Sequence, residues 1–164
     1  MPKLSAGIIV YRINTDGHAE ILLVHPGGPF YKNKDKGAWS IPKGEYAEGE
    51  DALSAAIREF TEETGNALPE EGFIPLIPVK IKSGKIVSAW AVKANFKEPF
   101  IQSNFFEMEW PPASGKKQSF AETDKAEWFV LKEARQKINA GQTDLLDQLE
   151  EILSKTKENI VDNH

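Results

Sequence analysis

The segment from Asp51 to Thr64 constrains the fold more than any other, because its apolar residues recur with the period of an α-helix. On a helix that turns by about 100° per residue, Leu53, Ala56 and Phe60 share one face. Gly65 follows directly, at the position where a glycine commonly ends a helix. We therefore predict a helix over this segment, with its apolar face buried against another layer of the protein.

Runs rich in β-branched and aromatic residues predict strands on both sides of this helix. The predicted strands are Ser5–Arg12, Ala19–His25, Trp39–Ile41, Phe73–Lys82, Lys85–Phe96 and Lys125–Val130. A turn-like run, Asn14-Thr15-Asp16-Gly17, favours a hairpin or neighbouring strands for the first two. Ser83-Gly84 joins the fourth and fifth in the manner of a hairpin, and we expect this pair at the centre of the sheet.

Helical periodicity returns at the end of the chain, over Leu131–Ala140 and Thr143–Lys155. Strands interleaved with helices are typical of an α/β layer protein in which helices cover a mixed sheet. We expect residues 1–157 to form a single domain and residues 158–164 to form a frayed tail.

Two segments follow neither the helical nor the strand pattern of apolar residues. Pro26–Gly37 is rich in glycine, proline and lysine, which predicts an exposed loop. Ser103–Phe120 combines aromatic residues with two prolines, which predicts irregular structure and makes it a candidate substrate loop.

Charge and composition limit the classes of function. The formal net charge is −5, so the chain as a whole has no attraction for a nucleic acid backbone. A polyanionic substrate must therefore be held by a local site or by metal ions. The absence of cysteine excludes disulfides, thiolate metal sites and cysteine nucleophiles.

The chain shows no sign of a membrane or secretory segment. No apolar run approaches the roughly 20 residues needed to span a bilayer. The start, MPKLS, lacks the apolar region of a signal peptide. We expect a cytoplasmic protein without a membrane partner.

Three carboxylates gather on one side of the predicted 51–64 helix. Glu59 lies three and four residues before Glu62 and Glu63, and such like-charge neighbours repel by about 0.2–0.5 kcal/mol. Glu62 and Glu63 also lie in the last turn, where the helix dipole disfavours an anion by roughly 0.3–1 kcal/mol. A hard divalent cation such as Mg²⁺ would turn this repulsion into binding. The pattern alone equally allows a solvated acidic face in which Arg58 pairs with Glu62.

The residues around the helix follow a specific order. Gly44 is followed after five residues by Glu50, and after seven more by REFTEETG over residues 58–65. This order resembles the Nudix box, and the resemblance favours a metal site over a solvated acidic face. Asn66 departs from the pattern, which usually carries an apolar residue there. We expect this departure to change how the chain leaves the helix, not the chemistry.

The resemblance implies a Nudix-type α/β/α sandwich with a mixed β-sheet and a loop-helix-loop catalytic box. It implies a hydrolase that cuts the diphosphate bond of a nucleotide derivative with Mg²⁺, for which Mn²⁺ could substitute. It also implies that Arg58 and Glu50 form a structural pair.

By position in the box, the resemblance assigns a role to each acidic side chain. Glu59 and Glu63 would bind the metal, and Glu62 would be a further ligand or the base that activates water. Gly44 would offer its backbone carbonyl to the metal. Arg58 would hold the glutamates in place.

A second carboxylate outside the box often completes the metal or base set in relatives. We select Glu122, which lies six residues before Trp128 of the predicted last strand. This spacing resembles that of the diadenosine tetraphosphate hydrolase branch of the family. Glu107 and Glu109 are the alternatives.

Substrate contacts are expected next to the box. Lys43 precedes Gly44 and is a candidate phosphate contact, although a loop lysine is often only solvated. Trp39 and Tyr31 are candidate substrate-binding residues that could stack on a nucleobase, and core or loop packing is the alternative for each. Further aromatic candidates for stacking are Phe30, Phe105, Phe106 and Trp110.

The expected partner is a small nucleotide, with a dinucleoside polyphosphate or a nucleoside triphosphate as the leading substrates. One alternative is a Nudix-fold module that binds a nucleotide without cutting it, and the three intact box glutamates argue against it. Another is an RNA 5′-end pyrophosphohydrolase, which the acidic balance disfavours. We expect no DNA partner, and the sequence does not predict an oligomeric state.

Overall fold

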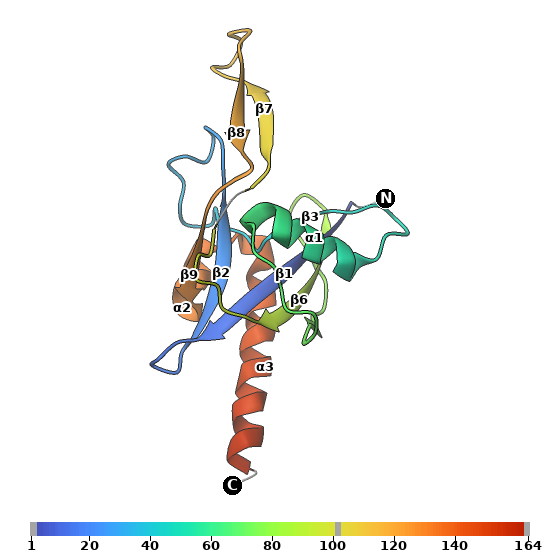
Figure 1. The fold of residues 1–164 in the computed structure, drawn as a ribbon, viewed down its shortest axis with the longest axis vertical. Coiled ribbons are helices and arrows are strands. Elements are labelled where there is room, and N and C mark those ends of the chain that lie inside the picture. Colours follow the sequence, from blue (N-terminus) through green and yellow to red (C-terminus); the bar gives the residue numbers. More distant parts are fainter. Residues whose placement is uncertain (1–2, 101–102, 163–164) are drawn as a thin grey trace.

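One mixed sheet forms the middle layer of the protein (Figure 1). The structure is a computed structural model that describes residues 3–100 and 103–162, and from residue 157 on it describes the backbone only. Its main strands, in spatial order, are β4 (Ile74–Pro75), β6 (Ile86–Lys93), β1 (Leu4–Ile13), β2 (Ala19–Pro26) and β9 (Thr123–Val130). β1 and β6 run parallel, and the other neighbours are antiparallel. Two short strands complete the sheet: β3 (Lys43–Glu45) pairs with β1, and β5 (Val79–Lys80) pairs with β6.

Most of the predicted strands are present, and the differences lie at the edge formed by β4 and β5 and at Trp39–Ile41. The hairpin of β1 and β2, the pairing of β5 with β6 and the last strand β9 are confirmed. The predicted strand Phe73–Lys82 is instead split into β4 and β5 at the edge, and β1 occupies the centre. Pro75 and Pro78 explain the split, because proline cannot donate a ladder hydrogen bond. The predicted strand Trp39–Ile41 is reduced to isolated bridges.

Helix α1 (Ala52–Thr64) confirms the helix predicted from periodicity. The Asp51 carboxylate caps its first turn by accepting a hydrogen bond from the backbone N–H of Ser54 at 3.0 Å. At the other end Gly65 has a φ of 79°, a conformation that glycine adopts without strain. Phe60 is fully buried between this helix and the sheet.

The C-terminal helices differ from prediction at their ends. α2 (Leu131–Lys137) is shorter than expected, because Ile138 is extended and bridges to Trp39. After a 3₁₀ turn at Ala140–Gln142, α3 (Thr143–Asp162) continues as a helix past the sheet (Figure 1). The backbone of residues 158–162 belongs to this helix, residues 163–164 lie outside the described part, and the frayed tail stays a prediction. Within that part, no helix combines the length and apolar content needed to cross a membrane.

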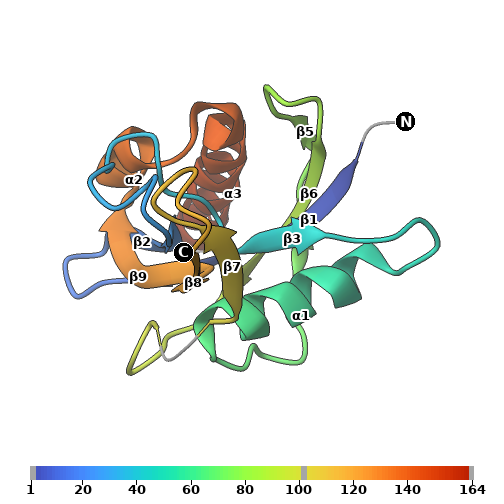
Figure 2. The ribbon, with the colours of Figure 1, turned by 90° about the horizontal axis from the view of Figure 1, so that it is seen from above.

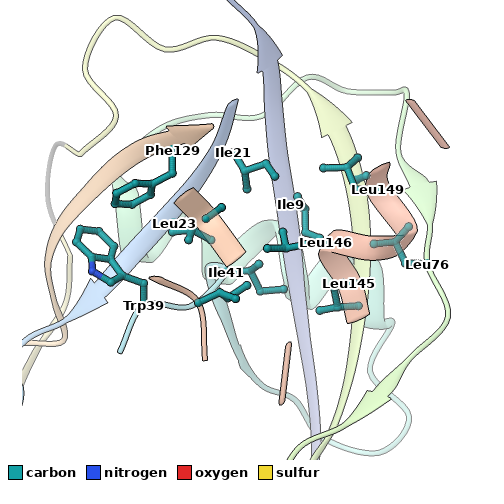
Figure 3. Packing of buried hydrophobic residues seen from close by; sticks show 14 of the residues in the cluster. Ile9, Ile21, Leu23, Trp39, Ile41, Leu76, Phe129, Leu145, Leu146 and Leu149 are labelled. Carbon is teal, nitrogen blue, oxygen red and sulfur yellow. The ribbon is translucent and has the colours of Figure 1, made fainter. Parts of the chain in front are cut away.

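The helices cover both faces of the sheet and so confirm the predicted α/β/α sandwich. Alternate residues of a strand point to opposite faces, and Ile8 packs toward α1 while Ile9 packs toward α3. Figure 3 shows this second cluster, in which Leu145, Leu146 and Leu149 of α3 meet the sheet.

A separate two-stranded hairpin replaces the irregular structure predicted for Ser103–Phe120. β7 (Phe105–Glu109) pairs with β8 (Lys117–Ala121) in a ladder of five residue pairs. The hairpin stands away from the main sheet at one end of the molecule (Figures 1 and 2). In β7, exposed and half-buried residues alternate, which is the period of a strand.

Candidate active site

The box glycine and the first box glutamate are in direct contact. β3 lies beside α1 (Figure 2), and a Cβ atom added to Gly44 would lie 2.1 Å from the carboxyl carbon of Glu59. A side chain at position 44 would displace the Glu59 carboxylate from this position. β3 is fixed from its other side, where the buried Ser5 hydroxyl donates a hydrogen bond of 3.0 Å to the Gly44 carbonyl. The approach of Glu59 to the β3 backbone is therefore built into the fold.

The last box glutamate, Glu63, faces a small cavity next to this contact. The backbone N–H of Lys43 donates a hydrogen bond of 3.1 Å to the Glu63 carboxylate. The cavity has a volume of about 130 Å³, and Lys43, Glu63 and Glu122 line it together with Val24, Pro26, Ser40, Ile41 and Thr123. The fold thus gathers three candidate site residues that are up to 79 positions apart in the sequence, counted from Lys43 to Glu122. The rivals Glu107 and Glu109 lie on β7, away from this lining.

Burial and repulsion from neighbouring carboxylates disfavour the ionised forms of Glu59 and Glu63. Burial, followed by the charge of Glu59, raises the pKa of Glu63 to about 8, and Glu122 adds to the effect. Burial, followed by the charge of Glu62, likewise raises the pKa of Glu59. A cation placed among them would stabilise the ionised forms and reverse both shifts.

Arg58 lies among the carboxylates on the solvent side of α1. Its guanidinium forms an ion pair with Glu50, as the resemblance implied. It also reaches Glu59 at 3.5 Å and Glu62 at 3.9 Å. Glu50 in turn accepts a hydrogen bond from the backbone N–H of Ala47, which ties the arginine to the loop before the helix. One side chain therefore links that loop to two of the three box glutamates.

The donor atoms at this site fit a hard divalent cation. The carboxylates of Glu59, Glu63 and Glu122 and the carbonyl of Gly44 are all oxygen donors, which Mg²⁺ prefers. The close approach of Glu59 to Gly44 brings two of these donors together. Within the described ranges, no three histidine or acidic side chains already converge on one point, so the carboxylates would have to turn toward a common ion.

The three predicted substrate residues lie in different environments. Lys43 is half-buried in the cavity lining, and burial followed by the charge of Lys85 lowers its pKa. Tyr31 is 42% exposed on the loop that follows β2. The prediction that Trp39 stacks on a base is wrong, because its ring is 1% exposed and packs against Phe129 in the core (Figure 3). The alternative of core packing holds for Trp39.

Some residues that shape the site were not predicted from the sequence. Gln142 is buried, and its side chain accepts a hydrogen bond of 3.1 Å from the Ile41 backbone and donates one of 3.0 Å to the Ser40 hydroxyl. It therefore fixes the segment that leads into Lys43. Nothing in its sequence context distinguishes this glutamine from a surface residue, because its partners are about 100 residues away.

The departure of the box at Asn66 has a structural explanation. The Asn66 amide donates hydrogen bonds to the backbone carbonyls of Glu98 at 3.0 Å and Pro99 at 3.1 Å. The side chain thus ties the exit of α1 to the segment after β6. As expected, the change concerns packing at the end of the helix.

Comparisons with known proteins agree with this geometry. Two structures of a C. elegans Ap4A hydrolase are 24% and 25% identical to this chain, with TM-scores of 0.63 and 0.59. They cover 92% and 93% of this chain, which spans 98% and 99% of theirs. The Nudix domain of Shewanella oneidensis NrtR, solved with ADP ribose, has a TM-score of 0.62 at 19% identity, covering 93% of this chain and 89% of its own.

A curated sequence relative matches over a shorter segment. An RxLR effector protein of Phytophthora infestans is 38% identical over 63 residues, which is 38% of this chain and 21% of that protein. This chain therefore matches about a fifth of the length of that relative. The model of the Nudix domain matches residues 1–149, nearly the whole chain. Because that model covers far more than half of the chain, the chain belongs to the Nudix domain family.

Proposed function

We propose that the protein hydrolyses a phosphoanhydride bond of a dinucleoside polyphosphate or a nucleoside triphosphate in the presence of Mg²⁺. The observation that carries the proposal is the meeting of Lys43, Glu63 and Glu122 around one cavity beside the contact of Gly44 with Glu59. The similarity to an Ap4A hydrolase over almost the full length supports this choice of substrate class.

The metal would be held by oxygen atoms of four residues. Glu59, Glu63 and the Gly44 carbonyl are the proposed ligands from the box, and Glu122 is the proposed ligand from outside it. Bound Mg²⁺ would neutralise the charge of the diphosphate and polarise its phosphorus–oxygen bonds. Mn²⁺ has the same preference for oxygen donors and would substitute.

The remaining side chains would bind the substrate and move the proton. The Lys43 ammonium would contact a phosphate oxygen as a point charge at the cavity wall. Glu62 has a side chain that is 41% exposed, so water can reach it, and it would accept the proton of the water that attacks phosphorus. The phosphate on the far side of the broken bond would leave with the anhydride oxygen. Arg58 would orient Glu59 and Glu62 without contacting the substrate.

A module that binds a nucleotide without cutting it is the second candidate. It is supported by the neighbouring NrtR domain, which was solved in complex with ADP ribose. The three box glutamates and Glu122, all present in this chain, favour hydrolysis instead. The cytoplasmic location inferred from the sequence stays a prediction.

The proposal is tested with a panel of nucleotides and Mg²⁺ in ¹⁸O-labelled water, with products identified by mass spectrometry. The panel contains nucleoside triphosphates, dinucleoside polyphosphates, ADP ribose and a 5′-triphosphorylated RNA. We expect metal-dependent cleavage of a dinucleoside polyphosphate or a triphosphate, and the position of the label identifies the phosphorus attacked. Binding of nucleotides without any cleavage would support the non-catalytic module.

A further inference from the structure

Two segments distant in sequence leave the rim of the catalytic cavity together. Pro26, at the end of β2, and Glu122, just after β8, both line the cavity. The backbone N–H of Gly27 donates a hydrogen bond of 2.9 Å to the carbonyl of Glu122. A Cβ atom on Gly27 would lie 1.9 Å from the carbonyl oxygen of Ala121, so the two backbones touch at this point. The loop after β2 and the β7–β8 hairpin therefore share one origin at the cavity.

The same two segments remain in contact farther from the rim. A Cβ atom on Gly28 would lie 3.0 Å from the ring of Phe106. Two residues later, the rings of Phe30 and Trp110 meet edge to face, with centroids 5.4 Å apart and planes at 78°. Phe30 lies four positions after Pro26, so their Cα atoms are at most about 14 Å apart. The aromatic pair is therefore within reach of a nucleotide whose phosphates occupy the cavity.

The hairpin presents one face to the loop and the opposite face to solvent. Phe106, Met108 and Trp110 alternate with Phe105, Glu107 and Glu109. The first set is half-buried and includes both residues that contact the loop, whereas the second set is exposed. Phe105, with an exposed fraction of 68%, thus belongs to the face turned away from Phe30.

The rings on the loop remain open to solvent. Phe30 is 58% exposed and Tyr31 is 42% exposed, although burying an aromatic ring is favourable. The Lys34 ammonium lies 5.4 Å from the centre of the Tyr31 ring, which places a positive charge beside this surface. An open ring next to a cation suits a planar heterocycle that carries phosphates.

Building on the proposed function, we propose that Phe30 and Trp110 form the surface on which the base of the nucleotide substrate stacks. The pair would make the enzyme prefer phosphoanhydrides that carry a base over those that carry none. Trp110 fixes the orientation of the Phe30 ring through the edge-to-face contact, and the exposed part of Phe30 receives the base.

A larger apolar cavity lies too far away to hold this base. It measures about 440 Å³ and is lined by Ile13, Ala19, Leu131 and Leu153, among others. Ala19 begins β2 and Pro26 ends it, and eight residues of strand extend over about 23 Å between these Cα atoms. The Phe30–Trp110 pair, in contrast, adjoins the catalytic rim.

The test compares Phe30→Ala and Trp110→Ala with the wild-type protein and with Phe105→Ala as a matched control on the other face of the same hairpin. Affinity for a methylene-bridged ATP analogue is measured by calorimetry, and inorganic tripolyphosphate serves as the ligand without a base. Hydrolysis of ATP and of Ap4A is followed in parallel. Phe30→Tyr, which keeps an aromatic ring, is the conservative variant.

We expect Phe30→Ala and Trp110→Ala to weaken binding of the analogue and raise KM about tenfold or more, the range that the loss of one stacked base allows. Binding of tripolyphosphate and kcat should change less than about twofold, since stacking acts on binding. Phe30→Tyr and Phe105→Ala should retain wild-type affinity.

The proposal is overturned if both alanine variants bind the analogue as the wild-type protein does, or if they lose tripolyphosphate to the same extent. A loss confined to a 5′-triphosphorylated RNA would overturn it in favour of an RNA-end site. If the wild-type protein cleaves nothing but binds the analogue through this pair, the proposed hydrolysis fails and the stacking surface stands.

Discussion

Helices α1 and α3 cover opposite faces of one sheet, and they differ in where their charged residues lie along the helix. α3 begins with Asp144 in its first turn, where the helix dipole favours an anion, and pairs Glu151 with Lys155 one turn apart. α1 has no acidic residue in its first turn and places Glu62 and Glu63 in its last turn instead. Both helices bury an apolar face against the sheet. The first-turn charge of α3 supports its helix, while the last-turn carboxylates of α1 oppose theirs.

We propose that the difference separates residues that stabilise the fold from residues that take part in chemistry. α1 is held by Phe60 in the core and by its capping residue Asp51, and this stability offsets the repulsion among its carboxylates. Local rules of helix design commonly fail at functional sites. Substitutions on α1 should therefore change activity, and substitutions on α3 should change stability.

The largest expected effect is the loss of activity in Glu63→Gln. Removing one charged oxygen at the cavity should lower kcat/KM by at least about 100-fold, since it removes both a proposed ligand and the charge that favours a cation. The fold should persist, because the amide is isosteric and relieves repulsion with Glu59. Steady-state kinetics with Mg²⁺ and circular dichroism check the two halves of this prediction.

The matched control for that variant is Glu151→Gln on α3, which removes an exposed carboxylate of the other helix. Its activity should equal that of the wild-type protein. Full activity in Glu63→Gln would contradict the assignment of Glu63 as a metal ligand.

The opposite behaviour is expected of Leu149→Ala. Leu149 is fully buried between α3 and the sheet, and such truncations cost about 2–5 kcal/mol of folding free energy. The folded fraction should keep wild-type kcat at low temperature, because the cavity with Glu63 lies on the other side of the sheet. Urea unfolding and kinetics at 10 °C or so measure both quantities.

Leu149→Met keeps the apolar volume and should cost less than about 1.5 kcal/mol. A large drop in kcat without a loss of stability in Leu149→Ala would break the division between the two helices.

The features that the sequence could predict are those that depend on residues close together in the chain. The period, the capping residue and Gly65 lie within or beside α1, so local physics specifies this helix and the order of its carboxylates. The β1–β2 hairpin is equally local, because a turn directly joins its strands. The resemblance supplied the roles of Gly44 and Glu59 as metal ligands, whereas their direct contact is found only in the structure.

Other features depend on partners far along the chain. Gln142 binds the backbone before Lys43 across about 100 residues, and Ser5 binds Gly44 across 39. For Trp39, stacking and core packing require the same ring, and only the tertiary structure distinguishes them. The β7–β8 hairpin was missed because the two prolines and the glycine of its turn concealed short strands. Sequence reasoning was accurate for α1 and the β1–β2 hairpin, and it failed where distant partners or the residues of a long turn decide the structure.

A smaller effect is expected in the pH dependence of stability without metal. The folded-state pKa of Glu63 is about 8 and its ordinary value is 4.5, so folding favours the protonated carboxyl. This contribution is complete below pH 4.5 and is lost as the pH rises through 8. We expect the metal-free protein to lose about 1–3 kcal/mol of stability across this range, since one pKa unit corresponds to about 1.4 kcal/mol and solvent screens part of it.

Urea unfolding between pH 5 and pH 9, in the presence of a chelator, measures this loss. Glu63→Gln should abolish most of it, because the amide does not titrate. Glu151→Gln should retain it in full. A rise in stability over the same range would show that the α1 carboxylates do not oppose one another.

The smallest effect concerns two arginines that each bridge two or more carboxylates. Arg135 of α2 forms ion pairs with Asp147 and Glu150 of α3. Arg58 of α1 pairs with Glu50 in the loop before the helix and with Glu59 and Glu62 of the helix itself. Both networks lie at the surface, where ion pairs are worth about 0–1 kcal/mol. Arg135→Lys should therefore shift the unfolding midpoint slightly and leave activity unchanged. Arg58→Lys should lower kcat, because a point charge cannot hold two glutamates in the way a planar guanidinium does. Wild-type activity in both variants would mean that Arg58, like Arg135, serves the fold alone.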